Sequence, residues 1–169
     1  MTSDARVVVG SGLARFEFAE HNCFACGSLN RTGLGMTIHI DRDAAWSALR
    51  LESRFEGWEG IAHGGILATL LDEIMGWTLA VGDDWGVTAR LAVQYRKPVE
   101  VDSDLRVEGW VTRRRRRVIE TAGRIVDATS GLEYATADGT YVTVDEARKR
   151  ELHERYGIRP ANMPETVAR

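Results

Sequence analysis

The chain has 169 residues, of which 44% are hydrophobic and 28% are charged. This length and composition are typical of one globular domain and argue against disordered and fibrous proteins. The formal net charge of −3 provides no attraction to nucleic acid or to an anionic membrane surface. The longest stretch without Asp, Glu, Lys or Arg is residues 60–71, which is too short for a membrane helix. Because the first residues also lack the features of a signal peptide, we expect a cytoplasmic protein with no nucleic-acid or membrane partner.

The first half of the chain predicts a lead-in, a hairpin and one helix. Residues 1–33 show weak periodicity and several turn-forming residues, which predicts an irregular or partly helical lead-in. Residues 34–51 alternate between apolar and polar side chains on both sides of a polar break at 41–43, which predicts a β-hairpin. Residues 61–81 are apolar with helical spacing on more than one face, which predicts a mostly buried helix.

The second half predicts several strands and a short helix. Residues 87–144 alternate with period two, which is typical of antiparallel strands. We expect turns at residues 98–104, in the arginine run 113–117, at residues 129–132 and near Asp138-Gly139. Asp145 and Gly157 suit the N-cap and the C-cap of an exposed helix between them.

These elements place the chain in the α+β class, because the strands and the helix are segregated along the sequence. We divide it into a lead-in at 1–33, a central domain at 34–144, and a C-terminal helix and tail at 145–169. One antiparallel sheet cannot cover every apolar side of the predicted helix, which implies that the chain forms a homo-oligomer.

Two adjacent carboxylates, Asp72 and Glu73, lie inside the apolar helix. Burying an unpaired charge costs several kcal/mol, so each carboxylate needs a partner, a route to solvent or a function. Small residues three, four and seven positions from Asp72 leave space for a ligand beside it, whereas Glu73 points about 100° away. Gly64 and Gly65 come at the helix start, where free N–H groups and the helix dipole favour an oxyanion. One element therefore supplies a candidate base and a candidate oxyanion site.

This motif carries a family resemblance. The His-Gly-Gly sequence at 63–65, followed by Asp72 within the order hairpin, helix, strands, resembles hotdog-fold acyl-CoA thioesterases of the PaaI type. Residues 55–72 are most similar to the branch that includes mammalian thioesterase superfamily members four and five. The cysteine-containing segment before the hairpin and Thr88 also match that branch, and the resemblance spans residues 21–144.

The resemblance implies a hotdog fold, in which an antiparallel sheet wraps around one long buried helix. It implies hydrolysis of an acyl-CoA thioester to a carboxylic acid and CoA, with no cofactor other than the CoA of the substrate. By the resemblance, Asp72 acts as base or nucleophile, the Gly64 N–H polarises the thioester carbonyl, Thr88 helps to position water, and His63 orients the loop. The active sites of the family lie at the interface of a homodimer, and dimers often pair into a homotetramer.

One position departs from the family pattern. Many members carry Asn or Gln six residues before the motif histidine, whereas this chain carries Gly57. The departure leaves an alternative open, a non-catalytic acyl-CoA-binding or regulatory protein on the same fold. A dehydratase or hydratase is disfavoured, because that chemistry generally needs a histidine and a carboxylate, and His63 belongs to the glycine turn.

Further residues are candidates for substrate binding. They are Gly65, Glu73, Trp58, Arg90, Arg113 and Arg115. Arginines suit the phosphates of CoA, and tryptophan suits an acyl pocket. The simpler interpretations are a solvated hairpin tip for the arginine run and a structural ion pair or rim position for Glu73.

Cys23 and Cys26 form a CxxC pair with His21 nearby. These three residues are possible zinc ligands, but structural zinc sites have four and the sequence shows no obvious fourth. No βαβ pattern surrounds the pair, which disfavours a thioredoxin-like redox role. We therefore predict no metal site.

Overall fold

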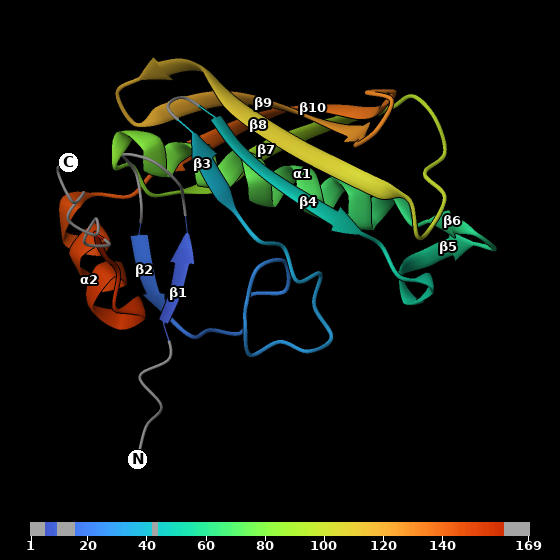
Figure 1. The fold of residues 1–169 in the computed structure, drawn as a ribbon. Coiled ribbons are helices and arrows are strands. Elements are labelled where there is room, and N and C mark those ends of the chain that lie inside the picture. Colours follow the sequence, from blue (N-terminus) through green and yellow to red (C-terminus); the bar gives the residue numbers. More distant parts are fainter. Residues whose placement is uncertain (1–5, 10–15, 42–43, 161–169) are drawn as a thin grey trace, which may run out of the picture.

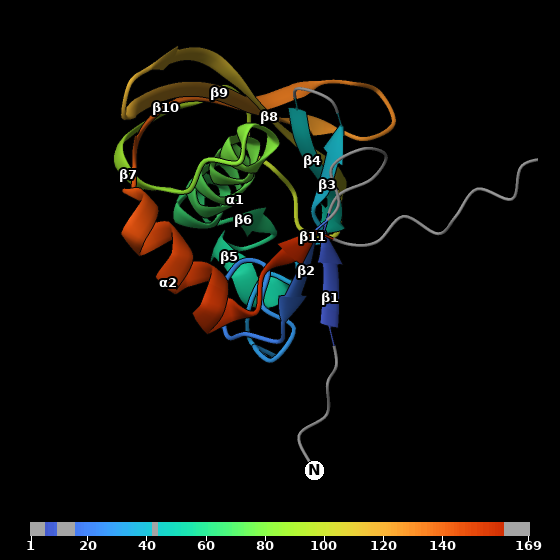
Figure 2. The same ribbon diagram turned by 90° about the vertical axis from the view of Figure 1, so that its left-hand side faces the viewer.

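A computed structural model describes residues 6–9, 16–41 and 44–160. Its main layer is a six-stranded antiparallel sheet in the order β3-β4-β8-β9-β10-β7 (Figure 1). The strands of this sheet are β3 (His39–Asp41), β4 (Ala44–Arg50), β7 (Gly86–Tyr95), β8 (Asp104–Arg115), β9 (Val118–Asp127) and β10 (Glu133–Thr143). A long helix, α1 (Gly64–Trp77), packs against one face, and Figure 2 views it nearly end-on beneath the curved sheet. The predicted class and the predicted packing of sheet on helix are confirmed.

Shorter elements lie on the side of α1 away from strands β8 to β10 (Figures 1 and 2). They include a three-stranded sheet of β1 (Arg6–Val9), β2 (Phe16–Ala19) and β11 (Arg159–Pro160), and the helix α2 (Glu146–Tyr156). The remaining elements are the strand pair β5 (Glu56–Trp58) and β6 (Ile61–Ala62), and the 3-10 helices η1 (Ser53–Phe55) and η2 (Thr78–Gly82). No helix in the described part of the chain is long and apolar enough to cross a membrane.

The apolar spacing of α1 explains its position against the sheet. Its buried side chains are Leu67, Leu70, Leu71, Ile74 and Met75. Two glycines of the sheet allow the helix to approach closely. A Cβ atom added to Gly109 of β8 would lie 3.2 Å from the backbone of Ile74, and one added to Gly123 of β9 would lie 2.9 Å from Met75 Cγ. Larger residues at these two positions would push the helix away from the sheet.

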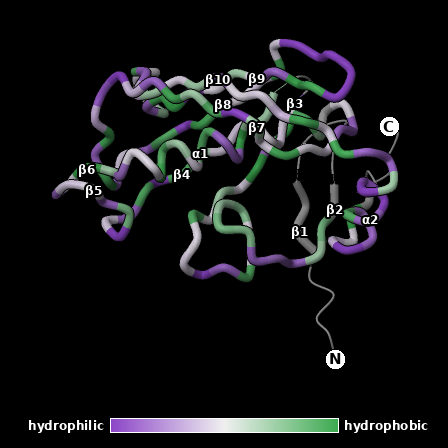
Figure 3. The backbone as a smooth tube through the Cα atoms, turned by 180° about the vertical axis from the view of Figure 1, so that it is seen from behind, coloured by the Kyte–Doolittle hydropathy of each residue, from purple (hydrophilic) through white to green (hydrophobic). Residues whose placement is uncertain are grey.

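The C-terminal helix forms as its capping residues predict. The Asp145 side chain accepts a hydrogen bond from the Arg148 N–H, and Gly157 ends the helix in the left-handed conformation with φ 57°. None of the α2 residues is buried, and Figure 3 shows this helix mostly in the hydrophilic colour.

Two expectations about local structure need correction. Residues 20–33 are irregular, as predicted, but the described residues before them form the strands β1 and β2, and no described residue before Leu34 is helical. The turn expected near Asp138-Gly139 is absent, because β10 runs through both residues. The reason is packing: a Cβ atom on Gly139 would lie 2.8 Å from Thr121 Oγ1 on the neighbouring strand. The glycine therefore serves a close contact inside the sheet and not a chain reversal.

Candidate active site

The His-Gly-Gly motif forms the N-terminus of α1. His63 is the N-cap, and its Nδ1 accepts a hydrogen bond from the Gly65 N–H at 2.9 Å. A Cβ atom on Gly65 would lie 3.0 Å from that Nδ1 atom, so the ring reaches the backbone because residue 65 has no side chain. Tyr95 donates from its hydroxyl to the Gly64 carbonyl at 2.8 Å. The Gly64 N–H makes no hydrogen bond with any described residue, so it is available to an oxyanion.

Gly57 lies directly against this turn. A Cβ atom at position 57 would be 3.2 Å from both Cα and Cδ2 of His63. Such contacts are tighter than normal, so a side chain here requires the turn to shift. At the position where many family members carry an amide, the His63 backbone and ring therefore leave little space for a side chain.

Asp72 is held by hydroxyl groups from two strands of the sheet. Thr88 of β7 donates from Oγ1 to Asp72 Oδ1 at 2.8 Å. Tyr141 of β10 donates from its hydroxyl to the same oxygen at 3.0 Å and to the Asp72 carbonyl at 2.9 Å. Burial and the charge of Asp72 raise the pKa of Tyr141 far above its ordinary value, so the phenol remains a donor. Asp72 Oδ2 has no hydrogen-bond partner among the described residues.

Asp72 faces a cavity of about 720 Å³. Its lining comes from α1, from the first residues of β7, from the lead-in and from the segment around α2. The residues are Phe18, His21, Asn22, Cys23, Cys26, Asp72, Glu73, Gly76, Trp77, Ala80, Asp84, Trp85, Gly86, Val87, Thr88, Tyr141, Tyr156 and Ile158. Aromatic and aliphatic side chains with a few convergent polar groups are typical of a small-molecule site.

The oxyanion donor and the base do not converge within one chain. Gly64 and Asp72 are eight residues apart on α1, which is about 12 Å along the helix axis. Neither His63 nor Gly64 lines the cavity that contains Asp72. The two groups come from one element, as the sequence suggests, but they are too far apart to contact the same carbonyl group.

Glu73 lies in the cavity wall beside the two cysteines. Trp77 Nε1 donates to Glu73 Oε1 at 2.8 Å, and Cys23 Sγ lies 3.9 and 3.8 Å from its two carboxylate oxygens. Of the two simpler interpretations of Glu73, the described residues show no cationic partner for an ion pair, and the position at the cavity wall agrees with a rim residue. A hydrogen bond with Cys26 lowers the pKa of Cys23 from 9.0 to about 6. The same hydrogen bond, together with burial, raises the pKa of Cys26.

The other candidates for substrate binding lie outside the cavity. Trp58 is 86% exposed on β5, and Gly65 lies at the helix start. Arg90, Arg113 and Arg115 are exposed on β7 and β8. Of the residues expected to bind substrate, only Glu73 lines the cavity of the single chain.

Sequence analysis missed the role of Tyr141. The sequence places Tyr141 only within the predicted strands of residues 87–144, and its partner Asp72 lies 69 positions away. A tyrosine in an apolar strand is the only signal in the sequence, since a buried phenol needs a hydrogen-bond partner.

Comparison with known proteins agrees with this architecture. Residues 59–134 match the family model described as the thioesterase superfamily. A solved thioesterase-superfamily protein has 27% sequence identity and a TM-score of 0.68, with 73% of this chain and 64% of that chain covered. The fold is a hotdog fold. This chain thus spans 64% of the length of that protein.

Two further solved structures share the fold at lower identity. A hypothetical thioesterase from Streptococcus pneumoniae, solved with coenzyme A, is 23% identical with a TM-score of 0.61, and 64% of this chain and 85% of that chain are covered. A protein from Streptococcus mutans, solved with acetyl-CoA, is 19% identical with a TM-score of 0.61, and 64% and 88% are covered. None of the curated proteins compared with this sequence matches it significantly.

Proposed function

We propose that this protein is an acyl-CoA thioesterase of the PaaI type that releases a carboxylic acid and free CoA. The observation that carries the proposal is the Asp72 carboxylate, held by Thr88 and Tyr141 at the wall of the cavity. The match of residues 59–134 to the thioesterase superfamily supports the reaction class. The hotdog neighbours solved with coenzyme A and acetyl-CoA support the substrate class.

The two hydroxyl donors give the two carboxylate oxygens of Asp72 different roles. Both donors bind Oδ1, so Oδ2 is left to accept a proton. In the proposed reaction, water attacks the thioester carbonyl carbon while Asp72 Oδ2 takes a proton from the water. The carbon–sulfur bond then breaks, and the proton passes from Asp72 to the departing thiolate. In a variant of this reaction, an Asp72 oxygen attacks the carbonyl carbon and the CoA thiolate leaves as an anhydride forms; water then hydrolyses the anhydride to the carboxylic acid and free Asp72, and the proton released protonates the thiolate. No metal or further cofactor takes part in either route.

A second copy of the chain completes the proposed site. The Gly64 N–H of the same chain lies about 12 Å along α1 from Asp72, so the oxyanion donor comes from a partner subunit. Strand β7 is an edge of the sheet, and it exposes Val87 at 63% and Tyr95 at 54%. An exposed apolar edge strand is suited to pairing with its own copy. We therefore propose a homodimer, or a homotetramer of paired dimers, and a mass of at least twice 18.8 kDa in light scattering tests this.

The test of function is thiol release from a panel of short, long and aromatic acyl-CoA thioesters. We compare the wild type with Asp72→Asn, which keeps the size of the side chain and removes its basicity. Asp138→Asn is the matched control, because Asp138 is an exposed β10 residue outside the cavity. We expect at least a hundredfold lower kcat for Asp72→Asn and unchanged kcat for the control. Equal activity of Asp72→Asn and the wild type contradicts the proposal.

Gly57 favours one second candidate, a non-catalytic acyl-CoA-binding protein. At the position where many family members carry a polar side chain, this chain has glycine, and a Cβ atom there would lie 3.2 Å from His63. This candidate predicts that calorimetry detects acyl-CoA binding while no member of the panel releases thiol. The same experiment therefore separates the two functions.

A further inference from the structure

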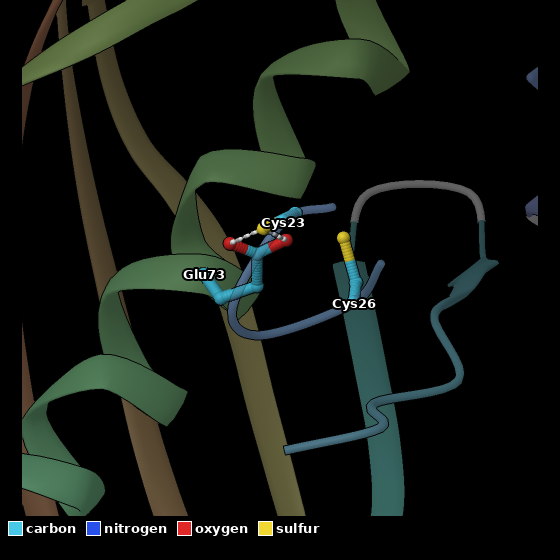
Figure 4. Close-up of side chains that lie close together, drawn as sticks. All are labelled: Cys23, Cys26 and Glu73. Atoms are coloured by element: carbon cyan, nitrogen blue, oxygen red, sulfur yellow. Dashed lines mark hydrogen bonds between the residues drawn. The ribbon is translucent and has the colours of Figure 1, made fainter. Parts of the chain in front are cut away.

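Two cysteines of the lead-in meet one carboxylate of α1 at the cavity wall. Figure 4 shows Cys23 and Cys26 on the loop that passes the helix at Glu73. One ligand atom from each of the three residues lies within 4.8 Å of the other two. All three residues line the cavity that contains Asp72. The proposed hydrolysis uses none of these three side chains.

The distance between Cys23 Sγ and the Glu73 carboxylate is close to that between a thiolate ligand and a carboxylate ligand of one tetrahedral zinc ion. Zinc binds sulfur at about 2.3 Å and a carboxylate oxygen at about 2.0 Å, so two such ligands at the tetrahedral angle lie about 3.5 Å apart. Cys23 Sγ lies 3.8 Å from the nearer carboxylate oxygen of Glu73. This pair therefore needs a movement of only a few tenths of an ångström, and Cys26 Sγ lies within 4.8 Å of both partners. The two residues between the cysteines also fit the usual ligand spacing of zinc sites.

We propose that Cys23, Cys26 and Glu73 bind a zinc-type divalent cation whose fourth coordination position opens into the cavity. Two thiolates select a soft or borderline metal over magnesium or calcium. Three protein ligands and one open position are the arrangement of catalytic zinc sites, in which water or a substrate atom completes the tetrahedron. On binding, the two thiols release their protons to solvent, and the divalent charge balances two thiolates and one carboxylate to a net charge of −1.

Neighbouring groups already orient the proposed ligands. Trp77 Nε1 donates to Glu73 Oε1 at 2.8 Å, which fixes the carboxylate on the side of the thiols. Such outer hydrogen bonds are a regular part of metal sites. His21 is not part of the cluster of close ligand atoms, and its Nδ1 accepts from the Cys23 N–H at 3.3 Å. The cluster therefore supplies three ligands, and the fourth position faces the cavity that all three residues line.

The experiment is a cobalt titration of the full-length protein, first stripped of metal with a chelator and kept reduced with a phosphine. Tetrahedral Co²⁺ bound to thiolate has a charge-transfer band in the near ultraviolet and visible bands that report its geometry. We expect one Co²⁺ per chain, both types of band, and displacement of the cobalt by Zn²⁺. Absence of the charge-transfer band, with both thiols still reactive toward a thiol reagent, overturns the proposal.

Variants assign the ligands. Cys23→Ser and Cys26→Ser each weaken the charge-transfer band, and Glu73→Gln lowers cobalt affinity at least a hundredfold while it retains an oxygen for Trp77. Trp77→Phe lowers the affinity by about ten- to a hundredfold, as expected for an outer partner. Asp84→Asn is the matched control, because Asp84 is a cavity carboxylate outside the cluster. An affinity for Glu73→Gln equal to that of the control overturns the three-residue site. The readout is independent of hydrolysis, so it separates this proposal from the proposed function.

Discussion

Replacing Tyr141 by phenylalanine removes one hydroxyl group from the interior of the molecule. Tyr141 is 2% exposed, and its hydroxyl donates to both Oδ1 and the carbonyl of Asp72. A hydrogen bond to a charged group contributes about 1.5–3 kcal/mol to stability. Asp72 keeps the hydrogen bond from Thr88, so we expect the lower part of this range, about 1.5–2 kcal/mol. For a chain of this length, that loss lowers Tm by roughly 3–8 °C.

The same substitution reports on catalysis through the position of Asp72. A loss of 1.4 kcal/mol in the transition state is about tenfold in rate, so we expect kcat to fall about tenfold with KM little changed. Tyr156→Phe is the matched control, because it deletes a hydroxyl from a 40% exposed side chain of the same cavity. Urea unfolding and thiol release measure the two effects. If Tyr141→Phe destabilises the protein no more than Tyr156→Phe does, the hydroxyl does not hold Asp72.

The pKa of Tyr141 gives a second measurement on the same variant. Burial favours the neutral phenol over the charged phenolate, so the pKa is raised. The wild type and Tyr141→Phe are therefore expected to gain the same phenolate absorbance up to about pH 11, although an ordinary tyrosine titrates near pH 10. A smaller gain in the variant means that Tyr141 is accessible to solvent.

Three further substitutions test the local structure. Asp145→Ala removes the N-cap of α2 and is expected to lower the free energy of unfolding by about 1 kcal/mol in urea, without effect on thiol release. Gly65→Ala places a methyl group 3.0 Å from His63 Nδ1, so we expect loss of the α1 cap, about 1 kcal/mol of destabilisation and slower hydrolysis. Gly139→Ala places a methyl group 2.8 Å from Thr121 Oγ1 and is expected to cost about 1–3 kcal/mol. If the unfolding of Gly139→Ala is unchanged, the contact with Thr121 does not restrict the size of the residue at this position.

Elements with a strong period or a clear cap could be predicted from the sequence. The hairpin of β3 and β4, the buried helix α1 and the capped helix α2 all depend on residues close together in the chain. Gly139 could not be assigned from the sequence, because glycine occurs both in turns and at close contacts, and only the neighbouring strand distinguishes the two uses. The pairing of β2 with β11 also escaped prediction, since β11 lies more than 130 residues further along the chain.

The candidate site also has a part that the sequence predicts and a part that only the folded structure shows. Asp72 could be singled out because a carboxylate inside an apolar helix is costly, and the family resemblance added Thr88. The hydrogen bonds that Thr88 and Tyr141 donate to Asp72 depend on how the strands pack against α1, so they could not be predicted from the sequence. Burial of the lead-in against α1 likewise brings Cys23 to Glu73 over 50 positions. A pattern of neighbouring residues cannot predict a contact between residues that are 50 positions apart in the chain.

The adjacent carboxylates of α1 illustrate how one helix supplies two different environments to one cavity. Successive residues point about 100° apart on a helix. Asp72 therefore faces the sheet, where hydroxyl groups of Thr88 and Tyr141 hold it, while Glu73 faces the lead-in, where an indole N–H and a thiol contact it. The hydroxyl donors leave one oxygen of Asp72 free to accept a proton. The soft sulfur atoms beside Glu73 are instead suited to binding a metal cation. Because both carboxylates line the same cavity, a molecule bound against Asp72 also lies beside the proposed cation site.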